Sequence, residues 1–118
     1  MDFELTEEQK MLQTMVRDFC TKEIEPYAAE WDETEKFPSE TIKKMAEAGM
    51  FAAGLPTSVG GDGDPMSNTI AAEEICYRSS GLGVIYICST GLAIYPITLH
   101  GNEEQKQKYL THTVKTGA

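Results

Sequence analysis

Basic residues are scarce in this sequence. Ten lysines and arginines stand against 19 aspartates and glutamates, and the net charge is -9. Such a charge repels phosphate backbones and anionic lipid surfaces, so we expect no nucleic-acid partner and no membrane partner. The hydrophobic content of 41% is ordinary for a globular protein, and we expect residues 1–118 to form one folded domain.

Cysteines are also few, and they follow no disulfide pattern. Cys20, Cys76 and Cys88 are odd in number and include no C-x-x-C pair, which predicts reduced thiols buried among apolar neighbours. The first four residues lack the basic and apolar regions of a signal peptide and the arginines of a transit peptide. Both absences predict a cytoplasmic, prokaryotic protein.

The alternating pattern of a β-strand is absent, and apolar residues recur at helical spacing instead. The capping box Thr6–Gln9 predicts the start of a helix, whose apolar stripe contains Met11, Leu12, Met15, Val16 and Phe19. Local signals mark further helices around Tyr27–Trp31, from Phe37-Pro38 to a left-handed cap at Gly49, after Asp64-Pro65, and after a second capping box at Asn102–Gln105. The sequence therefore predicts an all-α fold, a helical bundle of about five or six helices.

The segment from Leu82 to Leu99 is apolar on nearly every side, and no charged residue occurs from Ser79 to Asn102. A helix with no polar face has to be surrounded, so we expect this helix to be the most buried one. Its length approaches that of a membrane span, but serine, threonine, glycine and proline occur within it. We therefore interpret it as the central helix of the bundle.

Few residues in the sequence could carry chemistry. The glycine-rich loop Gly60–Asp64 lacks a Walker lysine and follows no strand, which predicts a turn with positive φ rather than a phosphate site. His100 and His112 have no metal-ligand or triad partner at the required spacing. Glu73 and Glu74 point about 100° apart on a helix, so we expect one to face solvent and the other to form an ion pair. We predict no catalytic, cofactor-binding or metal-binding residue in this chain.

Four segments share their order and spacing with one known pattern, and together they cover essentially the whole chain. They are Asp2-Phe3-x-Leu5-Thr6-x-Glu8-Gln9, then Glu25-Pro26-x-Ala28-x-x-Trp31-Asp32 followed by Phe37-Pro38, then Ala48-Gly49-Met50-Phe51 leading through Leu55-Pro56 to Gly60-Gly61-x-Gly63, and finally residues 101–110. Each segment is weak alone. The combination resembles the N-terminal helical domain of acyl-CoA dehydrogenases.

The resemblance implies an FAD-dependent enzyme. In this family a glutamate removes the α-proton of an acyl-CoA thioester, the β-hydrogen leaves as hydride to FAD, and electrons pass to an electron-transferring flavoprotein. The family's flavin-contacting Leu-Thr-Glu-Pro segment lies in a middle β-domain and its catalytic glutamate in a C-terminal helical domain, both beyond residue 118. We therefore assign acyl-CoA, FAD and the electron-transferring flavoprotein to a full-length homo-oligomeric enzyme, and expect the 118-residue chain alone to be inactive and to bind no FAD.

The resemblance also implies that the uncharged helix around Ile85 forms part of the wall of the acyl pocket. Ile85, Cys88, Ser89 and Leu92 are spaced i, i+3, i+4 and i+7, which places them in one stripe. We call these four residues the acyl stripe and predict that they bind the acyl chain. A plain core role for the same residues stays open, because a central helix packs apolar residues on all sides.

Two other functions stay open. A stand-alone helical interaction module would have this fold without the chemistry. Acyl-CoA oxidases and flavin monooxygenases share the family's architecture and differ in electron acceptor. The ending Gly117-Ala118, on the approach to the next strand in the family pattern, favours a piece of a dehydrogenase.

Overall fold

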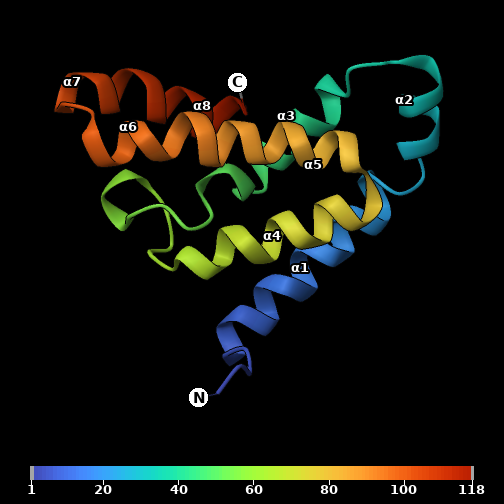
Figure 1. The fold of residues 1–118 in the computed structure, drawn as a ribbon, viewed down its shortest axis with the longest axis horizontal. Coiled ribbons are helices and arrows are strands. Elements are labelled where there is room, and N and C mark those ends of the chain that lie inside the picture. Colours follow the sequence, from blue (N-terminus) through green and yellow to red (C-terminus); the bar gives the residue numbers. More distant parts are fainter. Residues whose placement is uncertain (1, 118) are drawn as a thin grey trace.

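Helices account for most of the computed structural model, which describes residues 2–117 (Figure 1). Met1 and Ala118 lie outside the described residues, so the structure does not test the inferences drawn from the two ends of the sequence. No strand occurs between residues 2 and 117, and the predicted all-α bundle of about five or six helices is confirmed, with six helices. The helices are α1 (Glu7–Glu23), α2 (Ala28–Thr34), α3 (Ser39–Glu47), α4 (Pro65–Arg78), a long helix and a last helix.

The long helix and the last helix each contain a π-helical segment. The long helix, Ser80–His100, consists of α5 (Ser80–Ile87), the π segment η3 (Cys88–Ile94) and α6 (Tyr95–His100). The last helix consists of α7 (Glu103–Gln105), the π segment η4 (Lys106–Leu110) and α8 (Thr111–Thr116). Two short 3₁₀ turns, η1 (Met50–Ala52) and η2 (Thr57–Val59), lie in the connection between α3 and α4.

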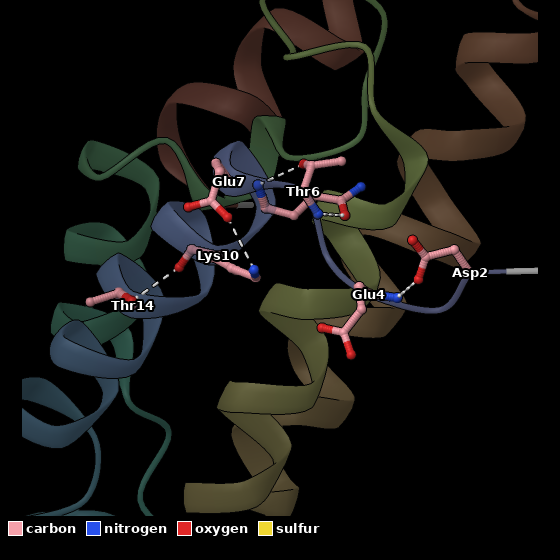
Figure 2. Close-up of polar contacts among 7 residues, drawn as sticks. Asp2, Glu4, Thr6, Glu7, Lys10 and Thr14 are labelled. Atoms are coloured by element: carbon pink, nitrogen blue, oxygen red, sulfur yellow. Dashed lines mark hydrogen bonds and ion pairs between the residues drawn. The ribbon is translucent and has the colours of Figure 1, made fainter.

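Hydrogen bonds within a few residues define where α1 and α4 begin. The Gln9 amide donates to Thr6 Oγ1 at 3.2 Å and the Thr6 amide donates to Gln9 Oε1 at 3.0 Å, which confirms the first capping box. Figure 2 shows this turn together with the Lys10–Glu7 ion pair of 3.0 Å. Gln9 Nε2 also donates to Asp64 Oδ2 at 2.8 Å. Because Asp64 is itself the N-cap of α4, this bond ties the two helix starts together.

The other predicted helix boundaries are confirmed as well. Gly49 follows α3 in the left-handed conformation, with φ 78°. Asp64 caps α4 by accepting from the Met66 amide at 3.0 Å, with Pro65 as the first helical residue. Asn102 and Gln105 form the second capping box at the start of the last helix.

The main core lies among α1, α3, α4 and α5, and it contains the residues Val16, Cys20, Ile24, Ile42, Met45, Ala46, Met50, Phe51, Ala71, Ile75, Leu82 and Tyr86. Part of the predicted stripe of α1 lies outside this core: Met11 is 73% exposed and Met15 is 49% exposed. α4 packs on α1 along the Val16–Cys20 side, so the helix turns the two methionines towards solvent. A second, smaller core joins Leu55, Ile94 and Leu110.

The long helix packs on α4 at its α5 end and on η4 at its α6 end (Figure 1). The expectation that it would be the most buried helix is wrong. Its buried side chains, which we call the inner face, are Leu82, Tyr86, Thr90 and Ile94. Its exposed large apolar side chains, which we call the outer face, are Val84, Ile87, Leu92, Tyr95 and Leu99. No element within residues 2–117 covers the outer face, which is why apolarity on all sides did not lead to burial on all sides.

Among the described residues, Ser80–His100 is the one helix long and apolar enough to cross a membrane, with a mean hydropathy of 1.7. Core helices of water-soluble proteins meet the same criteria, so the property is weak evidence for a membrane span. The inner face packs into both hydrophobic cores. We therefore interpret the segment as a helix of the folded domain rather than as a membrane span.

Candidate functional site

The start of the long helix is fixed against α4 by a cap and a close contact. The Leu82 amide donates to Ser79 Oγ at 3.2 Å, which caps α5. A Cβ atom on Gly83 would lie 2.3 Å from Cys76 Sγ. Only glycine at this position lets α5 approach α4 so closely.

A buried hydrogen-bond network anchors the middle of the inner face. The Tyr86 hydroxyl donates to the Met50 carbonyl at 2.9 Å and accepts from Asn68 Nδ2 at 3.2 Å. Thr90 Oγ1 donates to the Tyr86 carbonyl at 2.9 Å. Burial raises the pKa of the Tyr86 phenol well above its usual range, so the phenol stays neutral. The network is structural and holds the rotation of the long helix about its axis.

The π segment η3 keeps the two faces of the long helix straight. The inner-face residues follow one another at intervals of four, which is wider than the 3.6-residue turn of an α-helix. An α-helix would rotate such a series away from the core, whereas a wider π turn compensates for the rotation. Because η3 covers Cys88–Ile94, it includes three of the four residues of the acyl stripe.

The acyl stripe lies between the core and the solvent. Ile85 is half-buried and packs against the main core, and Ser89 is also half-buried. Cys88 is exposed and Leu92 is 72% exposed. Cys88 therefore differs from the buried thiol predicted above, because the outer side of the helix has no neighbour within the described residues. The exposed half of the stripe is available to a ligand or to another part of a larger protein.

One hollow reaches the acyl stripe, and sequence reasoning missed it. It has a volume of about 470 Å³, lies between α2 and the start of α5, and includes Ile85 and Leu82 with Trp31 and Phe37 in its lining. Asp32, Glu35, Lys36 and Arg78 also line it. Phe37, the aromatic residue before Pro38, was the available signal in the sequence. The sequence alone does not show that α2 lies beside the long helix.

The adjacent carboxylates on α4 behave as predicted. Glu73 is exposed, whereas Glu74 is only 5% exposed. Arg17 Nη2 lies 2.7 Å from Glu74 Oε1, and Arg17 Nε donates to both carboxylate oxygens at 3.2 Å. The hydrogen bond that Arg17 donates to Glu74, and then the negative charge of Glu74, raise the pKa of Arg17. Glu74 is therefore held in a structural ion pair between α1 and α4.

The glycine-rich loop is a turn closed by a carboxylate. Gly60 and Gly63 have φ values of 91° and 77°, which confirms the predicted positive φ. Asp62 Oδ1 accepts from the Gly54 amide at 3.0 Å and from the Asp64 amide at 3.1 Å. Residues 2–117 contain no group of three or more histidine, cysteine, aspartate or glutamate side chains placed to hold a metal ion.

Comparison with known proteins places this arrangement in one family. The model of the acyl-CoA dehydrogenase N-terminal domain matches residues 6–116. A short-chain specific acyl-CoA dehydrogenase from Clostridium acetobutylicum is 47% identical over 116 residues, which make up 98% of this chain and 31% of the relative. The solved structure of butyryl-CoA dehydrogenase from Megasphaera elsdenii matches with a TM-score of 0.91 at 29% identity, over 99% of this chain and 32% of that one.

A third similar protein contains the cofactor. An acyl-CoA dehydrogenase from Bacillus anthracis complexed with FAD matches with a TM-score of 0.84 at 31% identity, over 97% of this chain and 19% of that one. The chain thus spans about a third, or less, of the length of these relatives. The resemblance inferred from the four sequence segments is confirmed over nearly the whole chain, and members of the matched family bind FAD.

Proposed function

We propose a function from one premise: the chain belongs to the acyl-CoA dehydrogenase family, as its N-terminal domain. In a longer enzyme it serves α,β-desaturation of an acyl-CoA thioester. A carboxylate takes the α-proton, FAD takes the β-hydrogen as hydride, and the electrons pass to an electron-transferring flavoprotein. We assign the carboxylate and the FAD site, as the family resemblance implies, to the rest of the longer enzyme; this chain matches 31% of the clostridial relative.

FAD does not fit the described residues by themselves. The hollow beside Trp31 has no excess of positive charge in its lining, because Asp32 and Glu35 balance Lys36 and Arg78. Arg78 is also paired with Glu25, at 3.1 Å between Arg78 Nε and Glu25 Oε2, so nothing in this lining favours the diphosphate of the cofactor. The role of this domain is therefore to shape the substrate cavity.

The exposed half of the acyl stripe is the observation that carries this role. Cys88 and Leu92 lie open on a helix that has no charged residue and is anchored through Tyr86. An acyl chain is apolar, so it needs contact area and exclusion of water rather than polar partners. A rigid, uncharged stripe meets this need. The hydrogen bonds of Tyr86 hold the helix, and with it the stripe, in a fixed position against the core.

A chimera tests the proposal. Residues 1–118 replace the matching N-terminal part of the Clostridium acetobutylicum relative, which is 47% identical there; we call this protein the clostridial chimera. It should bind FAD and reduce an electron-accepting dye with butyryl-CoA, whereas the 118-residue chain alone should be colourless and inactive. A soluble, folded clostridial chimera that contains FAD but desaturates no acyl-CoA would reject the proposal and favour the stand-alone interaction module.

Electron acceptor and location belong to the same proposal. Transfer to an electron-transferring flavoprotein, rather than to oxygen as in an oxidase, is tested by the oxygen consumption of the clostridial chimera during turnover. The cytoplasmic location rests on the free state of Cys20, Cys76 and Cys88, which suits a reducing compartment.

A further inference from the structure

Gly81 borders the hollow between α2 and α5, and no contact within residues 2–117 requires a glycine there. Its φ lies outside the left-handed region that favours glycine, and an added Cβ would meet nothing within 4 Å. Gly83 differs, because its Cβ would lie 2.3 Å from Cys76 Sγ. Glycine in a helix is less stable than alanine. The space beside Gly81 is therefore open to something outside this domain.

Gly81 also extends the acyl stripe. It precedes Ile85 by four residues, and Ser89 follows Ile85 by four, so the three residues lie on one side of the long helix. Ile85 belongs both to the acyl stripe and to the lining of the hollow. The acyl stripe therefore continues past Ile85 and ends in the hollow at Gly81.

The lining of the hollow suits an apolar occupant. Trp31, Phe37 and Leu82 provide apolar surface, and Phe37 is 62% exposed. Arg78 is paired with Glu25 at 3.1 Å. The other charged residues of the lining are exposed, so their charges stay in water at the rim; they are Asp32, Glu35 and Lys36. An apolar group in the hollow therefore removes no unpaired charge from water.

We propose that the end of the acyl chain remote from the thioester passes Ile85 and lies in the hollow beside Gly81. The substrates of the longer enzyme are then acyl-CoA thioesters with chains long enough to reach the hollow, longer than butyryl. The hollow, of about 470 Å³, surrounds the chain end between α2 and α5, where apolar contact and exclusion of water stabilise it. The inference rests on the proposed function, which supplies the acyl-CoA.

Length and charge set the direction of the chain along the stripe. Leu92 and Gly81 are eleven positions apart, which corresponds to about 16 Å at 1.5 Å per residue and is several times the length of a butyryl group. A butyryl group with its thioester near Leu92 therefore ends before Ile85. The CoA end carries phosphates and stays out of the hollow, because the lining has no excess of positive charge.

Gly81→Leu tests the proposal by filling the hollow from the long helix. In the clostridial chimera it should weaken the binding of 2-dodecenoyl-CoA by about tenfold or more, because the chain end loses the contacts of one or more methylenes. The binding of 2-butenoyl-CoA should not change. These thioesters already carry the double bond, so desaturation does not consume them, and isothermal titration calorimetry gives both dissociation constants. Gly81→Ala should give a smaller loss, again for the long chain only.

Two further variants separate the hollow from the helix that borders it. Ala29→Leu adds volume from the opposite wall, on α2, and should weaken the binding of the long thioester in the same way. Thr69→Leu, at an exposed position of α4 outside the lining, is the control and should change neither dissociation constant. In the 118-residue chain none of the leucine variants should lower the melting temperature by more than about 2 °C, because each new side chain meets open space or solvent.

Three results would overturn the inference. An equal loss of affinity for both thioesters, or a loss for neither, would show that the chain end does not reach the hollow. A Gly81→Leu chimera that melts about 5 °C lower or more, with an unchanged ratio of the two affinities, would show that the hollow holds a part of the longer polypeptide. A folded chimera that binds neither thioester would contradict this inference and the proposed function together. Failure of the proposed function alone is distinct, since a chimera that desaturates no acyl-CoA still reports the ratio of the two dissociation constants.

Discussion

The two faces of the long helix differ in what covers them although they are similar in composition. The inner face packs into both cores through Tyr86 and Ile94, whereas the outer face, with Leu92 72% exposed and Leu99 55% exposed, meets solvent. Neither face has a charged residue. An apolar surface therefore indicates that something packs against it, but it does not show what packs there.

Polar bonding separates the two faces more sharply than hydrophobicity does. On the inner face the Tyr86 hydroxyl donates to the Met50 carbonyl at 2.9 Å, and this bond to another element fixes one rotation of the helix. Thr90 Oγ1 donates to the Tyr86 carbonyl at 2.9 Å within the same helix. The outer face consists, apart from the Tyr95 hydroxyl, of side chains that need only apolar contact. The inner face is thus specified by this domain, and the outer face by whatever the domain binds.

The largest effect is expected from Tyr86→Ala, on the inner face. Removing a fully buried aromatic ring should cost about 3–5 kcal/mol in the free energy of unfolding, enough to unfold much of the isolated domain. Tyr86→Phe keeps the ring but leaves the Met50 carbonyl without its donor, and should cost about 1–3 kcal/mol. Leu92→Ala, on the outer face, is the control and should change stability by less than about 0.5 kcal/mol. Urea denaturation followed by circular dichroism measures all three, and a Leu92→Ala loss equal to that of Tyr86→Ala would erase the distinction between the faces.

The next effect concerns substrate choice. Cys88→Trp adds volume to the acyl stripe, so in the clostridial chimera it should shift the chain-length preference towards shorter acyl-CoA thioesters. One or two methylenes of lost contact are worth roughly 1–3 kcal/mol each, a change of about tenfold or more in the ratio of kcat/KM for octanoyl-CoA and butyryl-CoA. The melting temperature of the 118-residue chain should hardly move, because Cys88 is exposed there. If Cys88→Trp strongly lowered the stability and left the chain-length preference unchanged, Cys88 would be a packing residue and not part of the substrate site.

A smaller effect appears at alkaline pH and comes from the interior. Burial raises the pKa of the Cys20 thiol to about 11 from its ordinary value of 9.0. Between these two values the unfolded chain releases a proton that the folded chain keeps, so stability should fall as the pH rises from 9 to 11. The slope of unfolding free energy against pH in this range should be smaller in Cys20→Ala than in the wild type. Equal slopes in wild type and Cys20→Ala would show that Cys20 is not the group responsible.

Local signals in the sequence predicted the helix boundaries well. Capping at Thr6, Asp64 and Asn102 involves atoms two or three residues apart, so the information is present in a short segment. The left-handed Gly49 is local in the same sense. Helical geometry also predicted that one of Glu73 and Glu74 would be paired and the other exposed. It did not show that Glu74 is the paired one, because its partner Arg17 is 57 residues away in the sequence.

The burial of side chains and the rotation of each helix about its axis were harder to predict, because both depend on elements that are distant in the sequence. Met11 shows the limit: its spacing fitted an apolar stripe, but α4 covers only one edge of α1 and Met11 is 73% exposed. The long helix shows it again, since the π segment η3 changes the rotation per residue and no local signal announced it. The acyl stripe was predicted as a set of neighbours, and its members do lie between core and solvent, but the sequence carried no information about the part of the enzyme that faces them.

Alkylation of Cys88 tests most directly that the exposed half of the acyl stripe is open in this domain and covered in the longer enzyme. Iodoacetamide labelling, localised by mass spectrometry of the peptide, gives a rate for Cys88 with buried Cys20 as the internal control. Cys88 should react readily in the 118-residue chain, at least about tenfold more slowly in the clostridial chimera, and more slowly still when octanoyl-CoA is present. Equal rates of Cys88 labelling in the chain and the chimera, with no protection by acyl-CoA, would contradict the account.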